Sequence, residues 1–224
     1  MNFIFDFDGT LADSSLGIYE AFKHSCKKNN LIYPDLNSFK KNIGPPINKL
    51  IHKIFPNIEG IVKEKFIIDF REEYDNNCYQ KFQWYEGVFE TLNYLTEGNK
   101  NNLYIITNKP TSICIKLLKG SNLYQLFDTV IGIDYLFYIR SKQAKVFSKK
   151  SVAIDYLIKQ RNLNKNKCVY IGDTIEDKIS SEKCGINFIP ALYGFYEWNS
   201  NDSANFKLES ISNLINHSSI YYNN

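Results

Sequence analysis

What this sequence lacks excludes several classes of protein. Its formal net charge is only +3 over 224 residues, which is too small to predict binding to nucleic acid or to a membrane surface. No uncharged apolar run is long enough to span a membrane, and no charged and apolar leader opens the chain. The cysteines are odd in number and never paired at metal-ligand spacing; they are Cys26, Cys78, Cys114, Cys168 and Cys184. These absences predict a soluble, unsecreted protein of the reducing cytoplasm, with neither nucleic acid nor membrane as a partner.

The pattern of apolar residues divides the chain into two parts. The composition is that of an ordinary globular protein, with 44% hydrophobic and 23% charged residues. The first part shows helical spacing and no strand signal, and we expect helices over residues 16–28, 36–43, 47–55 and 58–77. After Gly87, helix and strand patterns alternate, which is typical of a doubly wound parallel sheet. We therefore predict an α/β fold with a Rossmann-like core over residues 1–14 and 85–224, and an inserted, all-helical cap domain over residues 15–84.

Within the core, the predicted strands cover residues 3–5, 103–106, 129–131, 168–171 and 187–189. The predicted helices cover residues 88–95, 110–119, 150–160 and 175–184. The aromatic run at residues 135–139 fits either a strand or a packed loop. A weak helix is expected near residues 208–216, followed by a frayed polar end at residues 218–224.

The most informative stretch lies near the N-terminus. Phe3-Ile4-Phe5 is a continuous apolar run, which predicts a strand buried on both faces. Asp6 ends that strand and Asp8 follows two residues later, so both carboxylates can point into one crevice. Two carboxylates this close repel by roughly 4 kcal/mol at an effective dielectric constant near 20, so the pair calls for a cation. Gly9 permits a sharp exit beside a ligand, and Thr10 adds a hydroxyl. A calcium loop is excluded because the glutamate that such a loop needs is missing.

Other polar residues follow later strands. Thr107 and Asn108 come directly after a predicted strand, although the same pair is common in ordinary turns. Asp173 follows another strand and Asp177 lies one helical turn later, so both can face one cation. Alternatively, Asp173 or Thr174 caps the helix and Asp177 interacts favourably with its N-terminal dipole, and both interpretations can hold at once.

Three segments resemble motifs of the haloacid dehalogenase-like phosphatases. Residues 6–11 resemble the first motif, Thr107-Asn108 the second and residues 172–177 the fourth. Lys150 best fits the lysine of the third motif, Lys149 is a close rival and Lys145 is a weaker one. The position of this lysine stays open because Ser151 follows Lys150, where the family often has proline.

The resemblance implies a Mg²⁺-dependent hydrolysis of a phosphate ester. It implies Asp6 as the nucleophile, Asp8 as the acid and base, and Thr107 and Lys150 as the groups that neutralise the phosphoryl oxygens. The metal ligands would be Asp6, the backbone carbonyl of Asp8, Asp173 and Asp177. The implied phosphate-binding residues are Gly9, Thr10, Asn108 and Lys149.

Residues 43–46, 85–88 and 107–110 are similar to the phosphoglycolate phosphatase-like branch, so the expected partner is a small-molecule phosphate ester. The helical insertion resembles the cap of that branch, where Lys49 or Arg71 could approach the substrate. A nucleotidase, a pyrophosphatase or a sugar phosphomutase of the same fold remains open. The alternative outside the enzymes is a non-catalytic binding module. The large number of acidic residues in one crevice argues against it. The sequence leaves open whether the protein is a monomer or a homodimer.

Overall fold

The computed structural model describes residues 1–99, 101–139, 147, 149–199 and 206–216. Five strands form a parallel sheet in the order β5-β4-β1-β6-β7. They are β1 (Asn2–Phe5), β4 (Asn102–Ile106), β5 (Thr129–Ile131), β6 (Cys168–Gly172) and β7 (Asn187–Pro190). Phe5 of the central strand β1 lies opposite Ile105 of β4 and Ile171 of β6, so these three strands end at the same level. The predicted doubly wound α/β fold is confirmed.

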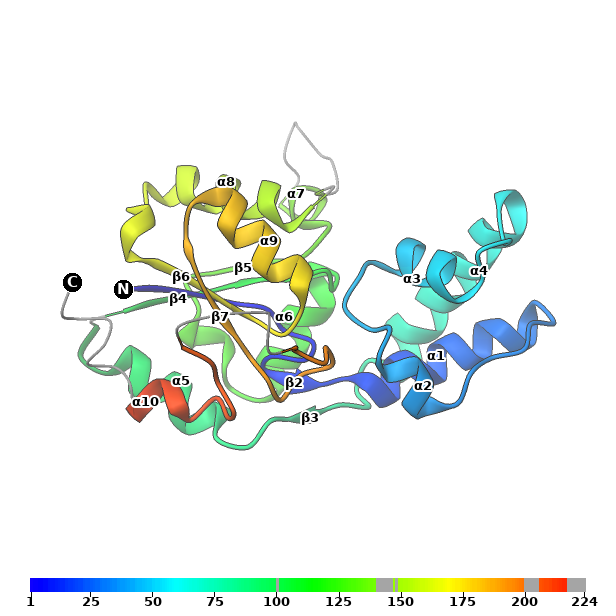
Figure 1. Ribbon diagram of the computed structural model, residues 1–224, viewed down its shortest axis with the longest axis horizontal. Helices are drawn as coiled ribbons and strands as arrows, with labels where there is room; N and C mark the ends of the chain where they lie inside the picture. Colours follow the sequence, from blue (N-terminus) through cyan, green and yellow to red (C-terminus); the bar gives the residue numbers. More distant parts are fainter. Residues whose placement is uncertain (100, 140–146, 148, 200–205, 217–224) are drawn as a thin grey trace.

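Helices cover both faces of the sheet (Figure 1). Phe3 and Phe5 point to one face, where they join the buried residues of α5 (Val88–Thr96), α6 (Thr111–Gly120) and the short α10 (Asn213–Asn216). Ile4 points to the other face and joins α8 (Lys150–Arg161) and α9 (Ile175–Cys184). The apolar run of β1 is therefore continuous because both of its faces are buried. Three short 3₁₀ helices lie between these elements: η2 (Glu97–Asn99), η3 (Tyr124–Leu126) and η4 (Lys165–Lys167).

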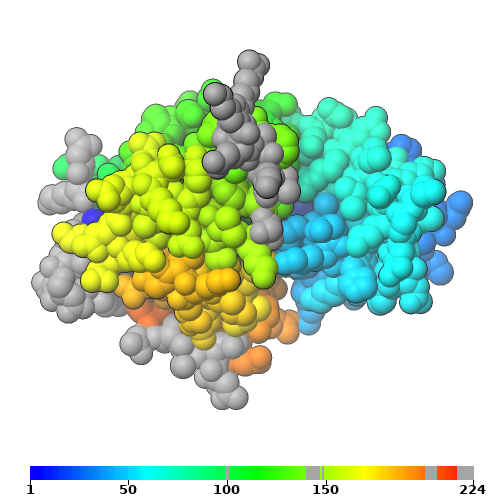
Figure 2. All heavy atoms as spheres, turned by 90° about the horizontal axis from the view of Figure 1, so that it is seen from above, coloured from blue at the N-terminus to red at the C-terminus, as the bar shows by residue number. Residues whose placement is uncertain are grey.

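The helices within residues 15–78 form a separate lobe, which we call the helical unit. It contains α1 (Ser15–Lys28), α2 (Leu36–Lys40), α3 (Ile47–Ile54), α4 (Gly60–Glu73) and the π-helix η1 (Tyr74–Cys78). The lobe lies beside the sheet and its helices (Figures 1 and 2). Phe22 is its centre, with the rings of Phe39 and Phe66 at 4.7 and 5.2 Å between centroids. These rings pack closely inside the unit and belong to the same buried cluster that reaches the sheet.

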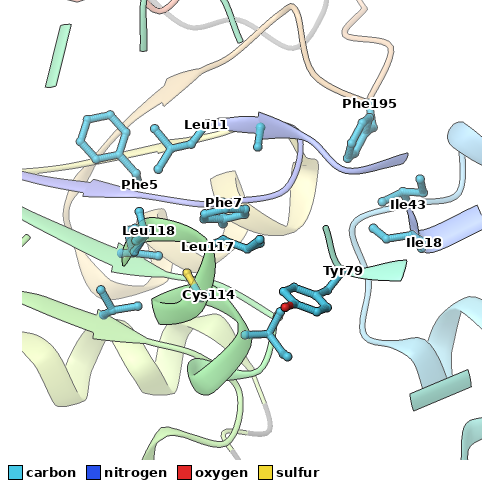
Figure 3. Close-up of a cluster of buried hydrophobic side chains, with 14 of the residues drawn as sticks. Phe5, Phe7, Leu11, Ile18, Ile43, Tyr79, Cys114, Leu117, Leu118 and Phe195 are labelled. Carbon is cyan, nitrogen blue, oxygen red and sulfur yellow. The ribbon is translucent and has the colours of Figure 1, made fainter. Parts of the chain in front are cut away.

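Two very short strands join the helical unit to the sheet. β2 (Ala12–Asp13) and β3 (Gln83–Trp84) pair in antiparallel fashion, so the chain leaves and returns along one ribbon. Sequence reasoning missed this ribbon because two residues show no periodicity. Buried side chains continue from Phe7 through Tyr79 to Ile18 and Ile43 of the helical unit (Figure 3).

Other differences from the predictions are local. Residues 135–138 form a short helix, α7 (Tyr135–Tyr138), rather than a strand or loop, because Asp134 O accepts hydrogen bonds from Phe137 N and Tyr138 N. The predicted helix over residues 58–77 ends at Glu73 and continues as η1. The predicted helix over residues 36–43 stops at Lys40. In the predicted helix at residues 208–216, Leu208 instead forms a bridge with Ala191, and the helix α10 begins only at Asn213.

All five cysteines are buried free thiols. Among the described helices, none is long and apolar enough to cross a membrane. Lys145 and residues 218–224 lie outside the described residues.

Candidate active site

Three neighbouring strands deliver polar side chains to one edge of the sheet. Asp6 follows β1, Thr107 follows β4 and Asp173 follows β6. The backbone N–H of Asp6 donates to Ile171 O at 2.9 Å, which continues the pairing of β1 with β6 up to the aspartate. Because these strands are adjacent and end together, residues from distant parts of the sequence meet at their carboxyl ends.

Asp6, Asp173 and Asp177 form a buried cluster of carboxylates. One carboxylate oxygen of each residue lies within 4.8 Å of those of the other two. Burial raises the pKa of Asp6 to about 7, although Lys150 opposes the shift. Burial, together with the charges of Asp177 and Asp6, raises the pKa of Asp173 well above its usual range. This arrangement is unfavourable for three negative charges unless cations offset them.

Asp177 also caps α9. Its Oδ2 accepts hydrogen bonds from Thr174 N at 3.0 Å and Thr174 Oγ1 at 2.6 Å, and its own backbone N–H donates to Thr174 Oγ1 at 3.3 Å, which completes a capping box. Its Oδ1 faces Lys150. Asp177 therefore takes part in the helix cap and in the carboxylate cluster at the same time, because its two carboxylate oxygens contact different partners.

Lys150 supplies one of the required cations. Its Nζ lies 2.5 Å from Asp6 Oδ2 and 2.6 Å from Asp177 Oδ1, and its side chain is 2% exposed. Burial by itself lowers the pKa of Lys150, but the two carboxylates raise it well above its usual range. Lys149, by contrast, is exposed and precedes the first turn of α8. Of these two neighbours, only Lys150 contacts the carboxylate cluster.

The surroundings of Asp173 fit a further cation. Its Oδ2 accepts a hydrogen bond from Phe195 N at 2.8 Å, whereas its buried Oδ1 has no partner among the described residues. Gly9, with a φ of +81°, presses against this carboxylate so closely that a Cβ would lie 2.1 Å from Asp173 Oδ2. A buried set of carboxylate oxygens with one oxygen unpaired suits a hard divalent cation such as Mg²⁺.

Asp8 lies beside this cluster and has its own partners. Its Oδ1 lies 2.9 Å from Lys109 Nζ and accepts a hydrogen bond from Ser14 Oγ at 2.5 Å. Lys109 also donates to Tyr74 OH at 2.5 Å. Ser14, Tyr74 and Lys109 were not among the predicted site residues. Lys109 could have been found, since it directly follows Thr107 and Asn108.

The predicted phosphate-binding residues differ in their contacts. The hydroxyl of Thr107 accepts a hydrogen bond from Lys109 N at 3.2 Å. Thr10 is fully buried, and its Oγ1 has no partner within the described part of the chain. Asn108 Nδ2 donates to Gly44 O at 3.0 Å, so this amide links the sheet edge to the helical unit.

A cleft separates the sheet edge from the helical unit, and its empty volume, including the part open to solvent, is about 580 Å³. The sheet side contributes Asp6, Asp8, Thr107, Asn108 and Lys109, and the helical unit contributes Ile18, Ile43, Ile47, Leu50, Phe70, Arg71 and Tyr74. Of the two cap residues singled out from the sequence, Arg71 lines the cleft. Lys49 instead pairs with Glu176 at 3.1 Å. A charged group of a ligand would therefore lie at the sheet edge, with the rest of the ligand against a mainly apolar wall.

Comparison with known proteins agrees with this geometry. The model of a family described as haloacid dehalogenase-like hydrolase matches residues 3–191. A 5'-nucleotidase of Pseudomonas aeruginosa is 25% identical over 87% of this chain and 83% of its own. A phosphoglycolate phosphatase of Aquifex aeolicus is 28% identical over 95% of this chain and 93% of its own. The crystal structure of a predicted phosphatase from Clostridium acetobutylicum superposes with a TM-score of 0.84 at 27% identity, covering 99% of this chain and 98% of the other.

Proposed function

Since this chain belongs to the haloacid dehalogenase-like hydrolase family and is a phosphoric monoester hydrolase, we propose that it hydrolyses a small-molecule phosphate monoester through an aspartyl-phosphate, with Mg²⁺ as cofactor. One observation carries the proposal. Asp6, Asp173 and Asp177 converge at the ends of adjacent strands, with Lys150 bound to two of them and one oxygen of Asp173 unpaired within the described residues.

In the proposed reaction, a carboxylate oxygen of Asp6 attacks phosphorus while the bond from phosphorus to the ester oxygen breaks. Asp8 gives its proton to the departing alkoxide. Water then attacks the aspartyl-phosphate, Asp8 takes a proton from it, and phosphate leaves Asp6. Lys150 and Thr107 stabilise the negative charge on the transferring group, which is where most catalysis of phosphoryl transfer lies.

The residues that would hold Mg²⁺ are Asp6, the backbone carbonyl of Asp8, Asp173 and Asp177. When bound, the ion would supply positive charge to the phosphoryl oxygens. We propose Gly9, Thr10, Asn108 and Lys149 as further contacts of the phosphate; the unpaired hydroxyl of Thr10 among the described residues supports its inclusion.

We propose that residues 15–84 act as a cap that excludes water and selects the leaving group. Both sides of the cleft contribute lining residues. Contacts between the two parts support a closed arrangement: Asn108 donates to Gly44 O within the cleft lining, and away from the cleft Lys40 of α2 pairs with Asp13 at 2.7 Å. The substrate proposed first is 2-phosphoglycolate, as for the Aquifex aeolicus relative; a 5'-nucleotide is the second candidate, from the Pseudomonas aeruginosa relative.

The test is phosphate release from p-nitrophenyl phosphate by the purified protein, with and without Mg²⁺, followed by 2-phosphoglycolate, sugar phosphates and 5'-nucleotides at equal concentration. The proposal expects Mg²⁺-dependent release and a preference for one class of ester. No release from any of these esters would instead favour a non-catalytic module. Phosphate moved between positions of one sugar, without net release, would indicate a mutase.

We expect Asp173→Asn to stabilise the metal-free protein and to abolish its stabilisation by Mg²⁺. The substitution removes one of three buried negative charges, and it also removes an oxygen charge that the cation needs. At a Mg²⁺ concentration of 100 times its dissociation constant, the wild type gains about 2.7 kcal/mol. Thermal unfolding with EDTA and with Mg²⁺ measures both effects. An equal rise in melting temperature on adding Mg²⁺ to the variant and to the wild type would show that Asp173 is not a ligand.

A further inference from the structure

Lys109 is a buried cation that the reaction proposed above does not use. Its side chain is only 1% exposed. Its Nζ contacts Asp8 Oδ1 and Tyr74 OH, and it lies 4.8 Å from the ring centroid of Tyr74 and 5.4 Å from that of Phe7. Removing an ammonium group from water is expensive unless such partners compensate for it. The contact with Asp8 is therefore a well-packed one rather than a chance surface pair.

The loop that carries Lys109 is fixed on both sides of the residue. Its backbone N–H donates to Thr107 Oγ1 at 3.2 Å, and its carbonyl accepts from Ile133 N at 3.2 Å. Gly132 allows the close approach of the neighbouring loop, because a Cβ at that position would lie 2.4 Å from Lys109 O. The loop after β4 thus places Thr107 and Lys109 together at the sheet edge.

Two donors act on a single oxygen of Asp8. Ser14 Oγ and Lys109 Nζ both contact Oδ1, at 2.5 and 2.9 Å. Within the described residues these are the contacts of the Asp8 side chain in this structure. Donors gathered on Oδ1 fix the plane of the carboxylate and leave Oδ2 to exchange a proton with a leaving group or a water molecule.

Tyr74, whose hydroxyl contacts Lys109, belongs to the helical unit. Tyr74 begins η1, where Tyr79 N donates to Tyr74 O across five residues at 2.9 Å. Such π-helical turns occur often at functional sites. The ring of Tyr74 is 3% exposed and stacks on Phe70, with 5.7 Å between centroids and 4° between planes. The hydroxyl of Tyr74 is thereby carried to Lys109 by the packing of the helical unit.

We propose that Lys109 is a positioning residue that orients Asp8 for proton transfer, and that Tyr74 makes this orientation depend on the helical unit being packed against the sheet edge. The inference rests on the proposed function, in which Asp8 is the acid and base. It adds a link through which closure of the cap would bring Asp8 into the orientation needed for acid catalysis. The leaving group would then be protonated only in the closed site.

The test compares kcat/KM for two esters of similar shape, p-nitrophenyl phosphate and phenyl phosphate. This ratio reports the steps up to the first phosphoryl transfer, and only the phenolate needs substantial protonation as it leaves. For Lys109→Met we expect a loss of about 100-fold with phenyl phosphate and less than about 10-fold with p-nitrophenyl phosphate, since general acid catalysis contributes at least about 10²-fold. Equal losses with both esters would overturn the proposal, because a merely structural role does not distinguish leaving groups.

Tyr74→Phe keeps the ring and its stacking and removes only the hydroxyl, so it tests the link even if Lys109→Met does not fold. We expect about a 10-fold loss with phenyl phosphate and little change with p-nitrophenyl phosphate; an unchanged ratio would overturn the coupling. Lys116→Met is the matched control, because Lys116 Nζ also lies over a tyrosine ring, that of Tyr79 at 4.3 Å, but Lys116 is an exposed residue of α6. Wild-type protein that cleaves neither these two esters nor 2-phosphoglycolate, sugar phosphates or 5'-nucleotides would refute the proposed function itself, whereas wild-type cleavage with equal losses refutes only this inference.

Discussion

Asp6→Asn is expected to lower kcat for p-nitrophenyl phosphate by about 10⁴-fold or more, because an amide cannot take the place of the attacking carboxylate. The variant should still fold. Asparagine has nearly the same shape, and Lys150 keeps its contact with Asp177 at 2.6 Å. Burial raises the pKa of Asp6 to about 7, so removal of its charge also relieves an unfavourable interaction in the metal-free protein.

The covalent intermediate gives this prediction a second measurement. Wild-type protein mixed rapidly with radiolabelled substrate and quenched in acid should carry label, and Asp6→Asn should carry none. Asp128→Asn is a suitable control, because Asp128 is exposed and lies just before β5, at the opposite end of that strand from the site. If Asp6→Asn kept more than about one per cent of wild-type kcat, a loss of under 10²-fold, Asp6 would not be the nucleophile.

Lys150→Met is expected to destabilise the protein by about 3–5 kcal/mol, because breaking a buried ion pair leaves its partners uncompensated. Here the partners are Asp6 and Asp177, both within 2.6 Å of the ammonium group. For a chain of this size the loss corresponds to a fall of roughly 10 °C in melting temperature. Turnover should fall as well, since Lys150 is the proposed partner of the transferring phosphoryl group.

The loss should depend on pH in a defined direction. Burial already raises the pKa values of Asp6 and Asp173, and Lys150 opposes both shifts, so without Lys150 these two values are raised further in the folded state and the protonated forms are favoured there. Stability is then retained at low pH and lost as the pH rises through those pKa values. Thermal unfolding in EDTA should therefore show a smaller difference from wild type at pH 5 than at pH 8.

Lys149→Met provides the matched control for Lys150→Met. The two lysines are neighbours, but Lys149 is exposed and Lys150 is 3% exposed. We expect Lys149→Met to change the free energy of unfolding by no more than about 0.5 kcal/mol, as is usual for a surface substitution. Equal destabilisation by both substitutions would mean that the pairing of Lys150 with the carboxylates contributes little.

Much of the fold could be predicted because its signals are local. The apolar run before Asp6 and the alternation of helix and strand after Gly87 predicted the parallel sheet, and the strand order β5-β4-β1-β6-β7 brings the predicted strand ends together. The aromatic run at residues 135–138 could not be assigned, because one helical turn is too short to show a period.

The candidate site was predictable only in part. Asp6 and Asp173 stand directly after strands, so their place at the sheet edge follows from position alone. The choice between Lys149 and Lys150 does not, because both stand at the start of one helix. A rotation of α8 by one residue, about 100°, exchanges a buried lysine for an exposed one. That rotation is set by the burial of Ile154 and Leu157 against the sheet.

The parallel sheet, the helical unit and the acidic residues at strand ends were predictable from the amino-acid sequence, because strand and helix periodicity and turn chemistry act between residues close in the chain. Tertiary structure alone decided that Lys150 rather than Lys149 enters the carboxylate cluster, and that Lys109 joins Asp8 to Tyr74. Those contacts join residues 27 to 144 positions apart. Local sequence patterns do not predict contacts between residues so far apart in the chain. These contacts form only when the helices pack on the sheet and the buried charges pair.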